Sequence, residues 1–156
     1  QVLHPEKYIA GEAPIAIDEP TWNTSLRRLG SNVLGEVQIR YILNDENAAA
    51  GWGGDRYTLF DHNGNNVLVW MSTWDSPTDA DEFSSAWRRY IGTRLQRNRN
   101  QDTPSLPQFV NDRFEYRREN TIFRIQRQGS HVLILEGPTE SGIDQVGQNA
   151  WAALSR

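Results

Sequence analysis

The sequence predicts an α+β domain in which an antiparallel sheet of about five strands packs against about three helices, in the order α-β-β-α-β-β-β-α. Two observations predict this class. Strand-like runs rich in aromatic and β-branched residues follow one another through short links, which favours antiparallel neighbours. Three other segments carry apolar residues at three- and four-residue spacing, as amphipathic helices do. The chain has 156 residues, an ordinary size for one domain, so we expect residues 1–156 to form a single domain.

The chain is expected to begin with an extended lead-in followed by a helix. Residues 1–23 contain three prolines and one glycine between short apolar pieces, which is typical of irregular structure. From Leu26 onward apolar residues recur at helical spacing. We interpret Gly30 and Ser31 as a turn before a main helix over about residues 32–44. The apolar face of this segment comprises Leu29, Val33, Leu34, Val37, Tyr41 and Ile42.

The clearest local pattern is a β-hairpin. Residues 55–60 and 67–74 are rich in aromatic and β-branched side chains, and Asn63-Gly64 lies between them. This dipeptide suits the two positive φ angles of a tight hairpin turn. We therefore predict two antiparallel strands joined at this point.

A second helix is predicted over about residues 77–97. Ser76 can cap its first turn, Pro77 suits the first helical position, and Asp79 completes a capping-box pattern. The buried face of this helix comprises Phe83, Trp87, Tyr90, Ile91 and Leu95. Residues 98–108 are mostly polar and contain two prolines, so we expect a mobile loop there.

Three strands and a terminal helix complete the prediction. The strands are expected at residues 113–118, 122–127 and 131–136. In the middle strand Arg124 and Gln126 alternate with apolar residues, so we expect one face of this strand to be exposed to solvent. A second capping pattern, at Ser141 and Asp144, should start the last helix. The apolar face of this helix comprises Ile143, Val146, Ala150, Trp151 and Leu154.

Composition argues against several classes of function. A formal net charge of −4 does not suit a general nucleic-acid binder, because phosphate contacts need an excess of lysine and arginine. We interpret the arginines of the second helix as its solvated face. The chain has no cysteine, which excludes disulfides and thiol chemistry. No apolar run reaches the roughly 20 residues that cross a bilayer. We expect no nucleic-acid partner and no membrane insertion by this chain.

The familiar catalytic motifs are missing from the sequence. It contains no zinc-binding H-E-x-x-H, no phosphate-binding glycine loop followed by lysine, and no G-x-S-x-G nucleophile elbow. His4, His62 and His131 are widely separated and lack the helical spacing of paired metal ligands. We therefore predict no catalytic residue, no metal ligand and no cofactor.

The most unusual segment is residues 48–57, where three glycines surround Trp52 just before a predicted strand. Glycines let the backbone turn sharply and approach a neighbour closely. One interpretation is a structural corner, in which Trp52 closes the end of the core and Arg56 pairs with a carboxylate such as Glu36. The other is a ligand-binding site composed of Trp52, Asp55, Arg56 and Glu36.

Several stretches resemble a known group of proteins. They are residues 1–8, 34–36, 49–57, 74–75 and 79–83. Together they resemble the C-terminal region of secreted, uncharacterised bacterial proteins that are similar to zinc metallopeptidases, and related stretches occur in archaeal surface proteins. The likeness covers most of residues 1–95. In those proteins a preceding region carries a His-Glu-x-x-His-type helix, so the resemblance implies zinc ligands outside this chain.

The resemblance implies an extracytoplasmic or cell-surface setting. It supports, as the first hypothesis, a non-catalytic accessory or interaction domain of a metallopeptidase-like protein. Its partner would be the upstream metallopeptidase-like region or a protein of the cell surface.

Two other functions remain open. The first is a self-contained hydrolase with a carboxylate and arginine site, made of Asp55, Arg56 and carboxylates such as Glu36 or Asp75. The second is a sugar- or peptide-binding module that stacks its ligand on exposed tryptophans such as Trp22, Trp52 or Trp74.

Overall fold

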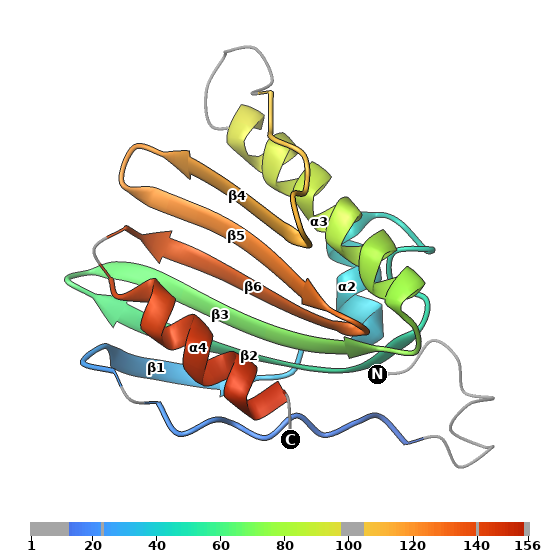
Figure 1. The fold of residues 1–156 in the computed structure, drawn as a ribbon, viewed down its shortest axis with the longest axis horizontal. Helices are drawn as coiled ribbons and strands as arrows, with labels where there is room; N and C mark the ends of the chain where they lie inside the picture. The colour runs from blue at the N-terminus through green and yellow to red at the C-terminus, as the bar shows by residue number, and fades with distance from the viewer. Residues whose placement is uncertain (1–12, 23, 98–104, 140, 155–156) are drawn as a thin grey trace.

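The computed structural model describes residues 13–22, 24–97, 105–139 and 141–154 (Figure 1). Within these ranges six strands form one antiparallel sheet with the spatial order β1-β2-β3-β6-β5-β4. The strands are β1 (Arg27–Asn32), β2 (Trp52–His62), β3 (Asn65–Trp74), β4 (Arg113–Arg118), β5 (Thr121–Gln128) and β6 (His131–Pro138). The helices are α2 (Gly35–Leu43), α3 (Pro77–Arg97) and α4 (Ile143–Leu154). The predicted α+β class is confirmed, with one strand more than expected.

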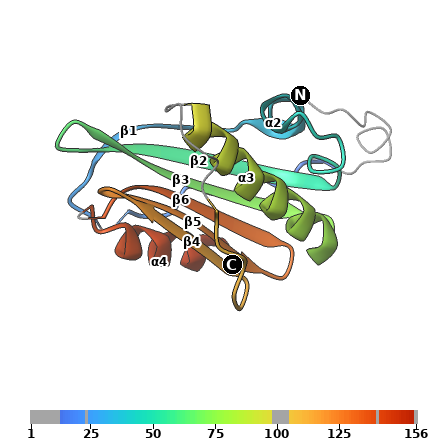
Figure 2. The same ribbon diagram turned by 90° about the horizontal axis from the view of Figure 1, so that it is seen from above.

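The helices cover opposite faces of the sheet, as Figure 2 shows. α2 and α3 lie on one face, where Trp70 of β3 packs against Phe83 and Trp87 of α3. α4 lies on the other face beside the extended residues 13–22, and Val146 packs there in a second apolar cluster. The central strands β3 and β6 are covered on both faces. This explains why they are apolar along most of their length instead of alternating.

The predicted hairpin and the capped second helix are both confirmed. β2 and β3 pair antiparallel, and Asn63 and Gly64 have φ angles of 51° and 83°, as the tight turn requires. At the start of α3 the Ser76 hydroxyl accepts a hydrogen bond from the Asp79 amide at 3.2 Å and donates one to its carboxylate at 2.7 Å. The first bond is the predicted N-cap contact; in the second the carboxylate binds the Ser76 hydroxyl, whereas a full capping box would bind the Ser76 amide.

The first predicted helix is present as α2, but the turn predicted before it is wrong. Residues Arg27–Asn32 form the edge strand β1, which pairs with β2 and carries a bulge between Arg28 and Gly30. α2 begins only at Gly35 and turns Ile39 into the core, while Val37 and Tyr41 are exposed. The apolar residues of 26–42 therefore do not share one buried face. Pairing with β2 is a tertiary contact that overrides the local helical spacing.

Two smaller expectations also change. The predicted cap at Ser141 is not formed, since no described amide of the first turn of α4 donates to its hydroxyl, which itself donates to the Pro138 carbonyl at 2.6 Å. Arg124 is only 4% exposed, because α4 covers the polar face of β5 at this position. This face is therefore not exposed to solvent there, contrary to the prediction. Residues 98–104 of the predicted loop lie outside the described residues. Residues 105–108 have no regular secondary structure, and Arg88 of α3 donates to the carbonyls of Leu106 and Pro107 there.

Candidate functional site

Asp55 is the central polar residue of the segment that the sequence singled out. Its side chain leaves β2 on the face covered by α2 and is 2% exposed. The carboxylate accepts four hydrogen bonds, all between 2.8 and 3.0 Å. The donors are the backbone amides of Leu34 and Gly35 and the indole Nε1 atoms of Trp52 and Trp70.

These contacts make Asp55 the cap of a helix that is distant in sequence. α2 has no side-chain cap of its own at Leu34. The Asp55 carboxylate binds two of its otherwise unpaired amides and opposes the positive end of the helix dipole. Since each oxygen already accepts two hydrogen bonds, little capacity remains for a ligand or a transferred proton. This geometry agrees with a structural role for Trp52 and Asp55 and weighs against a hydrolytic role for Asp55.

The glycines before Asp55 mark the place where the lead-in crosses β2. Ile15 donates its amide to the Gly53 carbonyl at 2.6 Å. A Cβ atom on Gly54 would lie only 2.0 Å from the Ile15 carbonyl oxygen. Arg56 then fixes the next residues of the lead-in, because its Nε donates to the Ile17 carbonyl at 2.5 Å. The close backbone approach expected from the glycines is therefore present.

The four predicted site residues do not form one pocket. Trp52 and Asp55 are hydrogen-bonded beside the start of α2, where Glu36 is also buried. Arg56 points to the opposite face of the sheet, because neighbouring residues of a strand alternate. Within the described ranges its polar partners are Ile17 and Ser31, and the predicted ion pair with Glu36 is not formed there.

The tryptophans do not form a shared stacking platform. Trp74 is 3% exposed and stacks on Phe83 with ring centroids 4.4 Å apart. Trp22 lies edge-on to Phe60 and donates to Glu19. These rings contribute to the two cores, which leaves the sugar-binding alternative without the coplanar exposed rings that it needs.

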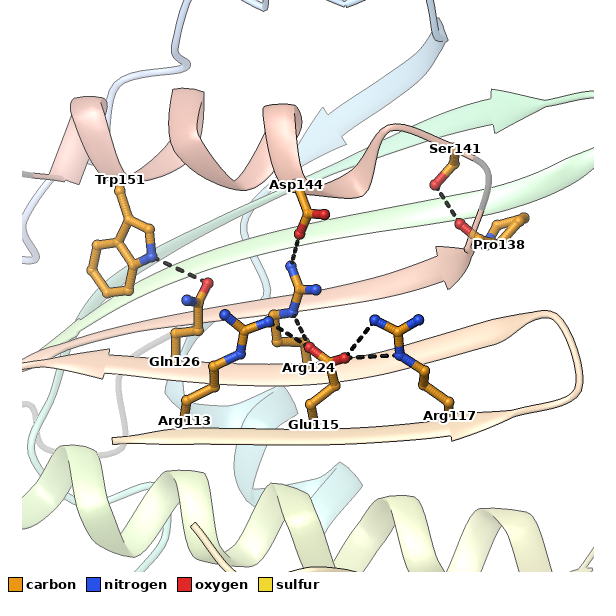
Figure 3. Close-up of polar contacts among 9 residues, drawn as sticks. All are labelled: Arg113, Glu115, Arg117, Arg124, Gln126, Pro138, Ser141, Asp144 and Trp151. Carbon is orange, nitrogen blue, oxygen red and sulfur yellow. Dashed lines mark hydrogen bonds and ion pairs between the residues drawn. The ribbon is translucent and has the colours of Figure 1, made fainter. Parts of the chain in front are cut away.

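A charged cluster on the α4 side of the sheet was not predicted (Figure 3). Glu115 of β4 accepts hydrogen bonds from Arg113 at 2.6 Å, Arg117 at 2.9 Å and Arg124 at 2.8 Å. Arg124 also donates to Asp144, in the first turn of α4, at 2.5 Å. We call these five residues the arginine cluster. It joins the edge of the sheet to α4.

The arginine cluster shifts the titration of Glu115. Partial burial alone would raise the pKa of this carboxyl, but the hydrogen bonds from Arg113, Arg117 and Arg124 outweigh burial and lower the pKa to about 2. Glu115 is therefore ionised at any physiological pH. Three guanidinium groups face two carboxylates, so the cluster keeps an excess of positive charge.

A second unpredicted feature is an apolar stripe on the outer side of α2. Val37 and Tyr41 lie one turn apart in α2 and are 38% and 87% exposed, and Val33, which precedes the helix, is 45% exposed. Side chains four apart are neighbours on a helix surface, so Val37 and Tyr41 form one stripe. We call it the α2 stripe. The sequence does indicate this stripe, because α2 has more apolar residues than can be buried on one face of a helix.

Neither a metal-binding cluster nor the cavity at the end of α4 provides a clear set of reactive side chains in the described ranges. Among the described side chains there is no group of three or more His, Asp or Glu residues that could hold a metal ion. A cavity of about 330 Å³ lies between residues 15–21 and the end of α4, and its lining includes Thr73, His131 and Asn149. In the part of the chain that the structure covers, every helix is too short or too polar to cross a bilayer.

A family model described as a domain of unknown function (DUF8575) matches residues 23–147 of the chain, which includes every strand, α2, α3 and the start of α4. The chain belongs to this family. No curated protein matches it. Among solved structures, the extracellular domain of PknH from Mycobacterium tuberculosis is similar at 10% identity, with a TM-score of 0.37, over 99% of this chain and 90% of that one. A similarity with so low an identity and TM-score gives no information about the function of this chain.

Proposed function

We propose that this DUF8575 domain is a non-catalytic interaction domain that docks onto a partner protein through the α2 stripe. The observation that carries the proposal is the exposure of Val37 and Tyr41 along one side of a helix whose other side already packs in the core. Ile39 is fully buried, so the stripe is not needed to hold α2 on the sheet.

The composition of the stripe suits a protein partner. Tyrosine is enriched among residues that dominate binding energy at interfaces, and an exposed aromatic ring flanked by aliphatic side chains is a common anchor. An ion pair lies beside the stripe, where Arg40 of α2 pairs with Glu46. A polar rim around an apolar centre is the usual anatomy of such an interface.

The proposed partner is the metallopeptidase-like region that precedes similar domains, in an extracytoplasmic or cell-surface protein. This part of the proposal rests on the sequence resemblance, which includes residues 34–36 at the start of α2 and residues 49–57, whose Asp55 caps that helix. The resemblance thus falls on the segments that hold the α2 stripe in place.

The test is a calorimetric titration of this domain with the separately produced upstream region. Replacing Val37 and Tyr41 together by glutamine should weaken saturable binding at least about tenfold, as expected for a central aromatic anchor. Val110→Gln is the matched control, because Val110 is a 68% exposed valine outside the stripe. Both variants should keep wild-type stability within about 0.5 kcal/mol, since the changed side chains are exposed.

Three results would decide the proposal. Binding by the wild type and the Val110 variant, with loss in the α2 double variant, supports it. Equal binding by all three proteins would exclude the α2 stripe as the docking surface. No binding by the wild type would exclude the upstream region as its partner.

A further inference from the structure

The sheet has two edge strands, and they differ in how they are protected. β1 carries a bulge between Arg28 and Gly30, a device that breaks the regular edge and discourages further pairing. β4 pairs with β5 in unbroken register from Arg113 to Arg118. Its free side is therefore the more regular template for an added strand.

The hydrogen-bond alternation identifies which groups of β4 face outward. Arg127 of β5 donates to the Asp112 carbonyl at 2.9 Å, so position 112 faces β5. Arg113, the next residue, exchanges both its main-chain hydrogen bonds with Val110 on the outer side. Antiparallel pairing alternates residue by residue. The main-chain amides and carbonyls of Glu115 and Arg117 therefore point away from the sheet.

No described residue accepts from or donates to these four outward groups. The tight turn at Val110–Arg113 closes the edge before Glu115, and the chain reverses after Arg118 at Glu119, whose φ is 53°. The open edge is therefore short, with room to pair at two positions.

The side chains beside this open edge are basic. Arg113, Glu115 and Arg117 lie on the same face, and the two arginine side chains are 47% and 60% exposed. Glu115 is already surrounded by three guanidinium groups, so it contributes little further attraction for a cation. The donors of Arg113 and Arg117 that do not contact Glu115 are available to an external carboxylate.

We propose that the open edge of β4 binds a short, extended, acidic segment of another protein, which adds as a strand beside Glu115 and Arg117 and places a carboxylate opposite Arg117. The main-chain groups provide hydrogen bonds for any extended peptide, and the arginine cluster selects acidic ones. This site is separate from the α2 stripe, so either proposal can fail without the other.

A second copy of the chain fits this edge less well. Pairing β4 with β4 of another molecule would bring two arginine clusters together, each with an excess of positive charge. Its glutamates are already occupied by their own arginines and cannot offset the repulsion. The charge therefore favours an acidic partner over self-association.

The test uses an N-acetylated, C-amidated peptide of alternating threonine and glutamate, about seven residues long to match a typical strand. Its control is the same peptide with lysine in place of glutamate. Binding is followed by amide NMR shifts of the ¹⁵N-labelled protein. We expect the largest shifts, and slower amide exchange, at Glu115 and Arg117 with the acidic peptide, and no saturable shift there with the lysine peptide.

Two variants separate main-chain pairing from charge. Arg117→Ala removes the charge and should weaken binding roughly two- to fivefold, as for the loss of one exposed ion pair. Arg117→Pro also removes the outward amide, which proline can do on an edge strand without breaking the ladder to β5. It should abolish the shifts. Circular dichroism checks that both variants fold, and the alanine variant alone still tests the charge if the proline variant does not.

Several results would overturn the inference. They are saturable binding of the lysine peptide with equal affinity, shifts at β1 in place of β4, and no shift at about millimolar peptide, the weak end of specific binding. Self-association of the free protein through β4, measured by sedimentation and lost in Arg117→Pro, would replace the acidic segment with a second copy.

Discussion

At the scale of single residues, Asp55 shows how a local motif becomes part of the fold. The sequence presents it between glycines and an arginine, which fits both a binding site and a structural corner. In the structure it accepts four hydrogen bonds in a buried position. The deciding partners, Leu34 and Trp70, lie in other elements, so local spacing could not identify them.

The first prediction concerns Asp55→Ala. Removing the carboxylate leaves two amides and two indole N–H groups without their acceptor, and losing one partner of a buried charged network costs about 3–5 kcal/mol. Urea unfolding followed by tryptophan fluorescence should show this loss. Asp55→Asn keeps one acceptor oxygen and should be less destabilised. A wild-type midpoint for Asp55→Ala would contradict the capping role.

The second prediction concerns acid stability. Glu115 has a folded-state pKa of about 2, below its ordinary value of 4.5. Its ionised form therefore stabilises the fold above the ordinary pKa, and this contribution is lost as pH falls from about 4.5 toward about 2. Glu115→Gln should be less stable than the wild type at neutral pH, and the difference should shrink across this acid range. A constant difference across the range would show that the charge of Glu115 is not responsible.

At the scale of elements, α2 shows how tertiary structure divides an amphipathic pattern. Its apolar residues satisfy helical spacing, yet only the side that includes Ile39 enters the core. The preceding residues join the sheet as β1, and this pairing fixes the direction in which α2 starts. The remaining apolar residues form the α2 stripe. A local rule that fails without an evident structural gain often marks a functional surface.

The third prediction concerns the capping of α3. Ser76→Ala removes the acceptor for the Asp79 amide and should destabilise the protein by about 1 kcal/mol, the usual cost of losing an N-cap. Ser76→Thr keeps the hydroxyl and should lie close to the wild type. Thermal or urea unfolding of the two variants measures the difference. Equal stability of Ser76→Ala and the wild type would show that Pro77 and the helix packing suffice to start α3.

At the scale of the whole molecule, the sheet is stabilised from both sides by elements distant in sequence. α3 covers one face, and α4 with the lead-in covers the other (Figures 1 and 2). The arginine cluster connects β4, β5 and α4 on that second face. We therefore expect a segment bound at the edge of β4 to affect the start of α4 as well, because Arg124 contacts both Glu115 and Asp144.

The fourth prediction concerns the attachment of the lead-in. Gly54→Ala would place a methyl group 2.0 Å from the Ile15 carbonyl oxygen, so the lead-in must move away from β2. Such overpacking costs about 1–3 kcal/mol. Hydrogen exchange at the Ile15 amide should accelerate more than exchange in β3. Gly64→Ala, where a new Cβ meets no atom within 4 Å but φ is +83°, separates backbone strain from this contact. Unchanged exchange at Ile15 would contradict the crossing point.

Sequence periodicity determined the elements whose information is local. The hairpin at Asn63-Gly64, the capped helix α3 and the three strands from 113 to 138 follow from turn chemistry, capping and alternation, and each was predicted close to its position. Tertiary structure alone decided that residues 27–32 form an edge strand, that Asp55 caps α2, and that Arg124 is buried under α4. It also decided which surfaces stay open, because exposure of the α2 stripe and of the β4 edge depends on what packs beside them. Local sequence encodes backbone preference, whereas partners across the sheet are set by the sum of long-range contacts.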